Sequence, residues 1–206
     1  MTPGTGGRSV VVVDDDRAVC TALSRLLRAH GWSVEVFPSA EAFLARDASQ
    51  PPACLVLDVN LPGLDGLDLQ RRLGDAGQAF PILFMTGYGD IPMSVRAMKA
   101  GATDFLTKPV CAEVLLAAVL AAVDASASDE RVHAERAELR ARFESLSARE
   151  REVLAGLAAG KLNKQVAGDL GIVEQTVKFH RARIMERMQA KSAAELMLIA
   201  AKLELG

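Results

Sequence analysis

Aromatic residues, cysteines and long apolar runs are all scarce in this chain. It has one tryptophan, one tyrosine and three cysteines in 206 residues. Cys20, Cys54 and Cys111 are widely spaced and lie among apolar neighbours, so we expect buried free thiols in a reducing compartment rather than disulfides or a metal site. No stretch approaches the ~18 apolar residues of a transmembrane helix, and no apolar stretch precedes the first strand-like run. We therefore expect no membrane span, no signal peptide and a cytoplasmic location.

The net charge of −2 is unevenly distributed. Residues 1–123 carry 10 basic and 13 acidic side chains, whereas residues 145–206 carry 10 basic and 7 acidic ones. The segment between them, 124–144, carries 4 and 6. An acidic front half and a basic back half are typical of a sensor domain joined to a nucleic-acid-binding domain.

Short β-branched runs alternate with helical patterns through the first 123 residues. The run at 9–13 has no polar alternation, which indicates a strand buried on both faces of a parallel sheet. Strands are expected at 9–13, 33–37, 53–57, 80–85 and 103–106, and helices are expected up to His30-Gly31 and near 39–47, 65–73, 91–100 and 111–123. Residues 1–123 are therefore predicted to form an α/β domain with a doubly wound, five-stranded parallel sheet.

The pattern changes after residue 123. Residues 124–144 are rich in Ala, Glu and Arg, which predicts a solvated helical linker that continues the fifth helix, with fraying around 126–128. A role for this linker in coupling the two domains is the alternative to a merely exposed helix face. Helical patterns at 148–159, 163–170, 174–188 and 192–203 then predict an all-α, four-helix domain over 145–206, with Ser147 and Ser192 as helix caps.

Carboxylates stand where two of the predicted strands end. The first strand runs directly into Asp14, Asp15 and Asp16, and the third into Asp58. If the strand order is flavodoxin-like, these ends are neighbours at the ligand-binding edge of the sheet. Crowded carboxylates require a cation, and hard oxygen ligands suit Mg²⁺.

The fourth and fifth strands bring the remaining groups to the same edge. The fourth ends at Thr86, which supplies a hydroxyl, and the fifth leads to Lys108, which supplies an ammonium group. A carboxylate nucleophile, a divalent cation, a hydroxyl and an ammonium group together make a phosphoryl-transfer site.

The segments VVVDDD, LVLDVNLPGLDG and MTGYGDIPMSVRAMKAGATDFLTKP resemble the receiver domains of two-component response regulators, in particular the FixJ-like branch. The resemblance covers residues 9–123 and implies a flavodoxin-like strand order. It implies that a sensor histidine kinase phosphorylates Asp58, and that Mg²⁺ is held by Asp15, Asp58 and the backbone carbonyl of Asn60, with Asp14 completing the acidic pair. It further implies that Thr86 and Lys108 contact the phosphoryl group, that Phe105 is an aromatic switch, and that the Lys108–Pro109 peptide is cis.

Other interpretations exist for some of these residues. Asp14, Asp15 and Asp58 each precede a helix and could act as helix caps, a role that we assign instead to Asp16. Phe105 taken alone is an ordinary core aromatic. Tyr88 lies two residues after Thr86, where the resemblance places the path of the hydrolytic water, and we expect its bulk to slow autodephosphorylation.

Residues 163–188 contain two helical patterns around Leu170-Gly171-Ile172, the arrangement of a helix-turn-helix. In the second pattern the spacing assigns Val177, His180 or Arg181, Ile184 and Met188 to the core. The same spacing assigns Gln175, Lys178, Phe179, Ala182 and Glu186 to the opposite, exposed face. This second face is suited to a DNA major groove.

Residues 145–206 resemble the LuxR/NarL-type DNA-binding domain, again of the FixJ-like branch. The resemblance implies binding to double-stranded promoter DNA and contact with RNA polymerase. Lys178, Phe179 and Ala182 are then expected to face bases, and Asn163, Lys164, Thr176, Arg181 and Arg183 to contact phosphates. A solvated helix face is the alternative for Arg183 and Arg187, and we assign His180 a structural role. Val173, which replaces the family's usual Ser before the recognition helix, cannot cap it, so we expect a frayed helix start.

The resemblance implies a switch in which phosphorylation of Asp58 repositions Thr86 and Phe105. The face around residues 93–108, made by the fourth helix and fifth strand, then forms a homodimer that binds DNA. The first rival is an aspartyl phosphatase of the haloacid dehalogenase type, but Asn60 stands where such an enzyme needs an acid-base Asp. The second rival is a phosphorylation-independent DNA-binding protein, against which the complete acidic set argues. We therefore expect no enzyme beyond phosphoryl acceptance and autodephosphorylation at Asp58.

Overall fold

The computed structural model describes residues 9–47, 49–87 and 91–205. The chain divides into two compact units, the first ending at Ser128 and the second beginning at Asp129. The division falls inside the segment that the sequence predicts as a linker. Within the described ranges, no helix combines the length and the apolar character that crossing a membrane requires.

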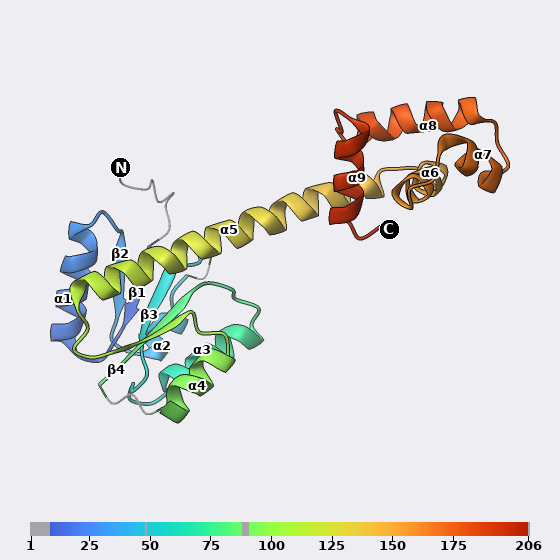
Figure 1. Ribbon diagram of the computed structural model, residues 1–206. Coiled ribbons are helices and arrows are strands. Elements are labelled where there is room, and N and C mark those ends of the chain that lie inside the picture. Colours follow the sequence, from blue (N-terminus) through green and yellow to red (C-terminus); the bar gives the residue numbers. More distant parts are fainter. Residues whose placement is uncertain (1–8, 48, 88–90, 206) are drawn as a thin grey trace. The chain divides into compact units, whose positions relative to one another are not determined.

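The first unit is built on a parallel sheet with the strand order β2-β1-β3-β4-β5 (Figure 1). Its strands are β1 (Val10–Val13), β2 (Val34–Phe37), β3 (Cys54–Asp58), β4 (Ile82–Thr86) and β5 (Asp104–Thr107). Its helices are α1 (Arg17–Ala29), α2 (Ala40–Leu44), α3 (Gly66–Asp75), α4 (Ile91–Lys99) and the long α5 (Ala112–Glu144). The predicted doubly wound α/β fold is confirmed, and no strand end differs from its predicted position by more than two residues.

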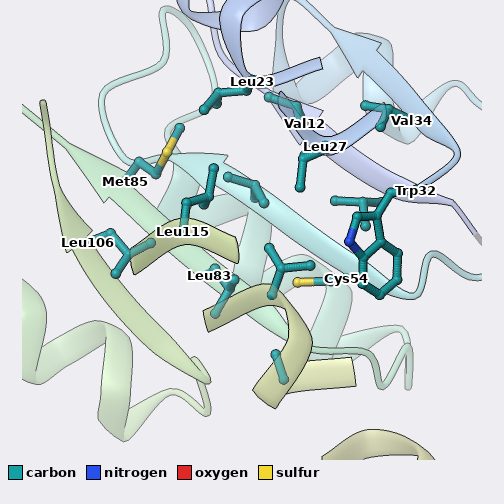
Figure 2. Packing of buried hydrophobic residues seen from close by; sticks show 14 of the residues in the cluster. Val12, Leu23, Leu27, Trp32, Val34, Cys54, Leu83, Met85, Leu106 and Leu115 are labelled. Carbon is teal, nitrogen blue, oxygen red and sulfur yellow. The ribbon is translucent and has the colours of Figure 1, made fainter. Parts of the chain in front are cut away.

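Two apolar cores cover the two faces of this sheet. On one face, α1 and α5 pack against β1, β3 and β4, with Leu27 and Leu115 fully buried (Figure 2). On the other face, α2, α3 and α4 contribute a second cluster that includes Phe43 and Leu69. The central strands β1, β3 and β4 are buried at every residue, as the runs without polar alternation predict.

Register brings the carboxyl ends of neighbouring strands together. Val13 pairs with Leu57, Asp58 with Met85, and Thr86 with Thr107. Polar residues that end β3 or follow β1 and β5 therefore lie at one edge of the sheet.

The helix α5 continues without interruption from Ala112 to Glu144. The expected fraying around 126–128 is therefore wrong, since the high content of good helix formers there outweighs the two serines. The expected burial of all three cysteines is also wrong at one position. Cys20 and Cys54 are buried, but Cys111 is exposed just before α5, with its thiol 2.6 Å from a carboxylate oxygen of Glu113.

The second unit contains α6 (Ala148–Ala158), α7 (Asn163–Leu170), α8 (Glu174–Arg187) and α9 (Ala193–Lys202). Ser147 and Ser192 cap α6 and α9 as predicted. Gly171 ends α7 at φ 64°, in the left-handed region, and allows the tight turn into α8. The core of this unit also includes Leu139 from the second half of α5.

Candidate functional site

Three carboxylates meet at the edge of the sheet in the first unit. Asp14 follows β1 and Asp58 ends β3, and together with Asp15 they place carboxylate oxygens within 4.8 Å of one another. Asp14 and Asp58 are buried, at 1% and 6% exposure, whereas Asp15 is exposed. Asp16 is not part of this group, because its side chain caps α1 by accepting from the amides of Ala18 and Val19. The predicted division of roles among the three consecutive aspartates is confirmed for Asp16.

Lys108 joins the two buried carboxylates. Its Nζ donates to Oδ2 of Asp14 at 2.6 Å and to Oδ2 of Asp58 at 2.8 Å. Burial raises the pKa of Asp14 above its usual range, although the bond from Lys108 acts in the opposite direction. Burial alone would lower the pKa of Lys108, but its bonds to the two carboxylates raise it. One ammonium group thus donates to two buried carboxyl groups.

The second oxygen of Asp58 is oriented by its own loop. The backbone N–H of Asn60 donates to Oδ1 of Asp58 at 3.0 Å, and the Asn60 side-chain amide lies 3.4 Å from the Thr86 hydroxyl. Thr86 is fully buried, and its carbonyl accepts from the Lys108 backbone N–H at 2.7 Å. The structure therefore brings together the predicted residues Asp14, Asp15, Asp58, Asn60, Thr86 and Lys108.

The donor set of this site fits a hard divalent cation. Its members are three carboxylates, all of them oxygen ligands, with the ammonium group of Lys108 beside them. Mg²⁺ prefers such ligands and retains several waters, for which the exposed side of Asp15 leaves access. The residues present thus suit Mg²⁺ in the way that the sequence predicts.

Two further sequence predictions concern aromatic residues near this edge. Phe105 on β5 is half-buried, and its ring lies 6.3 Å from that of Phe84 between centroids. It therefore borders the core and the surface, which is compatible with both interpretations of its role. Tyr88 lies outside the described residues. The Lys108–Pro109 peptide is cis, as the resemblance implies.

The loop between β3 and α3 has contacts that the sequence did not predict. Oε1 of Glu41, on α2, accepts from the Leu64 backbone N–H at 3.0 Å. Asp65 caps α3 by accepting from Asp68 N–H at 2.7 Å. Asp65 shows a recognisable capping pattern in the sequence, but Glu41 is more than twenty positions from its partner and leaves no local signal.

In the second unit, the two faces of α8 are as predicted. Val177, Ile184 and Met188 are fully buried, and His180 and Arg181 are half-buried. The residues predicted for the outward face, namely Gln175, Lys178, Phe179, Ala182 and Glu186, are all exposed. Phe179 is 55% exposed and is the large aromatic side chain on this outward face.

Side-chain contacts order this face of α8. The Arg183 guanidinium lies over the Phe179 ring, 5.0 Å from its centroid, and the His180 ring meets that of Phe179 edge-on at 5.9 Å. Lys178 pairs with Glu174 at 3.0 Å, a weak contact between exposed groups. Arg183 therefore has a stacking partner and is not simply a solvated side chain.

The residues predicted to contact phosphates lie on α7 and α8. Lys164 and Arg183 are exposed, and Asn163, Thr176 and Arg181 are half-buried. Val173 precedes α8 without any side-chain capping bond and is 68% exposed, which confirms that the helix lacks a cap.

A buried charge in the second unit was not singled out from the sequence. Glu150 is 2% exposed, and its carboxylate accepts from the Ser147 N–H at 2.8 Å and lies 3.6 Å from Arg187. The bond from the Ser147 backbone lowers the pKa of Glu150. Arg187 also donates to the Ser145 carbonyl at 2.7 Å, so its role is structural. The signal in the sequence is the Ser-x-x-Glu spacing of a capping box.

Ion pairs join the second half of α5 to the end of α9 and to the residues that follow it. Lys202 pairs with Glu135, and Arg136 with Glu204, each at 2.6 Å. Because Leu139 enters the core of the same unit, this half of α5 is a structural part of the second unit and not a wholly solvated linker.

Each of the two units matches a known protein family. Residues 10–120 match the response regulator receiver domain, and residues 144–200 match the bacterial regulatory proteins of the luxR family. The response regulator protein TodT of Pseudomonas putida is 47% identical over 196 residues, which cover 95% of this chain and 86% of TodT. The transcriptional regulatory protein FixJ of Bradyrhizobium diazoefficiens is 41% identical over 191 residues, 93% of each protein.

Solved structures show the same similarity. The response regulator StyR aligns with 96% of this chain and 100% of its own, with a TM-score of 0.83 and 43% identity. Full-length FixJ from B. japonicum aligns with 98% of this chain and 100% of its own, with a TM-score of 0.60 and 41% identity.

Proposed function

The chain belongs to the response regulators that join a receiver domain to a LuxR-family DNA-binding domain, and on that premise we propose that phosphorylation of Asp58 controls its binding to promoter DNA. Membership implies a histidine kinase as the source of the phosphoryl group, and an action on transcription in place of a metabolic reaction. The observation that carries the proposal is the position of Lys108, whose ammonium group reaches both Asp14 and Asp58.

This geometry supports the following phosphoacceptor reaction. A carboxylate oxygen of Asp58 attacks the phosphorus of a phosphohistidine, the P–N bond breaks, and the electron pair remains on the imidazole nitrogen. Lys108 moves its bonds from the carboxylate to the incoming phosphoryl oxygens, and the Thr86 hydroxyl donates to one of them. Asp15, Asp58 and the Asn60 carbonyl would hold Mg²⁺, which would supply positive charge that offsets the phosphoryl oxygens.

The response is transmitted through α4 and β5. Once Thr86 turns toward the phosphoryl group it vacates space beside Phe105, whose ring is free to rotate inward. The exposed apolar side chains of Val95 and Met98 on α4, at 44% and 47%, support a homodimer formed through the face of α4 and β5. A dimer matches DNA with two half-sites, which raises affinity for a two-fold promoter sequence.

DNA recognition is assigned to α7 and α8. Lys178, Phe179 and Ala182 face bases, while Asn163, Lys164, Thr176, Arg181 and Arg183 contact phosphates. The exposure of Phe179 and its stacking with Arg183 support this division. The bound dimer then contacts RNA polymerase, and the whole sequence of events takes place in the cytoplasm, where the promoter DNA lies.

Phosphate-affinity electrophoresis tests the proposal. The full chain is incubated with acetyl phosphate and Mg²⁺, with the Asp58→Asn variant as the control. Retarded migration of wild type alone, together with tighter binding to a duplex selected from a random library, is the expected result. An Asp58→Asn variant that is retarded equally, or a phosphorylated wild type that binds DNA no better, contradicts the proposal.

A further inference from the structure

Gly66, the first residue of α3, lies unusually close to the phosphoacceptor. A Cβ atom at this position would lie 2.4 Å from the backbone oxygen of Asp58, 3.0 Å from the Cα of Val59 and 3.2 Å from the carbonyl carbon of Asp58. All three are backbone atoms, which cannot turn away as a flexible side chain can. The first residue of α3 therefore lies in direct contact with the peptide bond between Asp58 and Val59.

The requirement for glycine here is one of space. Gly66 is not among the glycines with positive φ, whereas Gly63 in the same loop has φ 80°. Its own N–H donates to the Val59 carbonyl at 3.0 Å, which draws the helix start and the strand end together. The backbone conformation at Gly66 is open to other residues, but a side chain at that position would displace either the start of α3 or the peptide of Asp58.

Both α3 and the end of β3, which meet at this contact, are packed against the core. The helix α3 is fixed by Leu69 and Leu73, which are 0% and 2% exposed in the second core of the sheet, and by its cap at Asp65. The peptide of Asp58 and Val59 lies at the strand end, where the Val59 N–H donates to Met85 at 3.0 Å, and the Val59 side chain is buried in the same core. A methyl group at residue 66 would therefore push α3 and the strand end apart, which changes the position of Asp58 relative to the helix start.

We infer that Gly66 is a positioning residue for Asp58: the absence of its side chain allows α3 to hold the phosphoacceptor within reach of Lys108 and next to Asp14. The inference rests on the proposed function of Asp58. The Asp58 carboxylate is set by the same peptide, through its 2.8 Å bond to Lys108 and its 3.0 Å bond from the Asn60 N–H. A displaced peptide changes both distances, and catalysis that depends on positioning is sensitive to displacements of about 1 Å.

The matched control lies on the same helix. Gly74 is exposed, and a Cβ atom there meets nothing within 4 Å. Gly74→Ala should therefore keep the wild-type rate of phosphorylation and raise the melting temperature slightly, since alanine favours helix more than glycine. In the double variant Gly66→Ala/Gly74→Ala, the stabilising alanine at residue 74 offsets a loss of stability that Gly66→Ala causes.

The experiment measures the rate of phosphorylation by acetyl phosphate and Mg²⁺ in the full-length wild type, Gly66→Ala, Gly74→Ala and the double variant. Hydrogen exchange of the unphosphorylated proteins is recorded in parallel, without Mg²⁺. Gly66→Ala, alone or in the double variant, should slow phosphorylation about ten- to a hundredfold. It should also speed exchange at Val59 and Asn60 while leaving the amides of β1 unchanged.

Each other outcome overturns the inference. Wild-type rates in Gly66→Ala remove the positioning role. Faster exchange spread evenly over β1 and α1, or failure of both Gly66→Ala variants to fold, makes Gly66 a residue of general stability only. A wild type that takes no phosphate on Asp58 refutes the proposed function itself, which distinguishes that failure from the failure of the inference.

Discussion

Asp14, Asp58 and most of Lys108 are buried at the edge of the sheet, with Asp15 exposed beside them, whereas the charged side chains on the outward face of α8 are all exposed. Asp14 and Asp58 are 1% and 6% exposed, and the side chain of Lys108 is 21% exposed. On α8, the side chain of Lys178 is 53% exposed. Buried charges in contact depend on one another, because removing one leaves another unpaired. Exposed charges act on a ligand nearly independently and are screened by salt. Replacing one charged residue at the Asp58 site should therefore affect the other charged residues there. Replacing one charged residue on the outward face of α8 should affect only the contact that this residue makes.

The largest effect is expected at Lys108. Lys108→Met leaves Asp14 and Asp58 without their shared cation and should slow phosphorylation by about a hundredfold. The same change should destabilise the first unit by about 3 kcal/mol, since a buried carboxylate is left unpaired. Phosphorylation time courses and thermal unfolding of both variants measure these effects. Arg71→Met, at an ion pair whose arginine is 70% exposed, is the control and should change neither. Equal changes in phosphorylation rate and stability for Lys108→Met and Arg71→Met would contradict the claim that buried charges matter more than exposed ones.

The second unit contains one charge that should behave like those of the first. Glu150→Gln removes the anion that accepts from Ser147 and faces Arg187, and should lower the stability of the second unit by about 1–3 kcal/mol. Because the folded-state pKa of Glu150 lies below its ordinary value of 4.5, its contribution is complete above pH 4.5 and is lost as pH falls through the lower folded pKa.

Denaturant unfolding of wild type and Glu150→Gln across the acidic range tests this sign. The difference between the two should shrink as pH falls, and the exposed neighbour Glu152→Gln should show a difference of only a few tenths of a kcal/mol. A Glu150→Gln deficit that grows toward acid pH would reverse the assignment.

On the exposed face of α8 and α7, substitutions should distinguish contacts to phosphates from contacts to bases. Lys164→Ala should weaken binding to all DNA sequences alike and reduce the slope of log affinity against log salt by about 0.9. Phe179→Ala should leave that slope unchanged and relax the choice of base at one or two positions by about 1–3 kcal/mol. Selection from a random duplex library, followed by titrations at several salt concentrations, measures both. Replacement of thymine by uracil in the selected site should weaken wild type and not Phe179→Ala, if the ring contacts a thymine methyl group.

The smallest effect is expected at the start of α8. Val173→Ser supplies the missing cap and should stabilise the second unit by about 0.5–1 kcal/mol. Hydrogen exchange of the first turn of α8, in the absence of DNA, should slow in the variant. Exchange that is identical in the two proteins would show that the uncapped turn is not frayed.

The sequence predicted best what depends on order along the chain. Asp14, Asp58, Thr86 and Lys108 could be assigned to one site because parallel strands place their carboxyl ends at one edge once the strand order is known. The faces of α8 could be predicted because helical spacing decides which residues turn inward.

The features that were missed depend on contacts between distant segments. Two kinds of contact have no local pattern in the sequence: the bond between Glu41 and Leu64, and the ion pairs that join α5 to Lys202 and Glu204. Gly66 could be read as a turn glycine, and only the approach of α3 to the Asp58 carbonyl reveals the need for it. Cys111 has apolar neighbours in sequence, but it stands at a helix start on the surface, where neighbouring residues point in different directions.

The central claim is that phosphate on Asp58 controls DNA binding by the second unit. The most direct test is the affinity for one selected duplex, measured by fluorescence anisotropy for wild type and Asp58→Asn, each with and without acetyl phosphate and Mg²⁺. We expect acetyl phosphate to tighten binding of wild type about tenfold or more, which corresponds to a coupling free energy of about 1.4 kcal/mol, and to leave Asp58→Asn unchanged. Equal affinities in all four measurements, or equal tightening in the two proteins, would contradict the account.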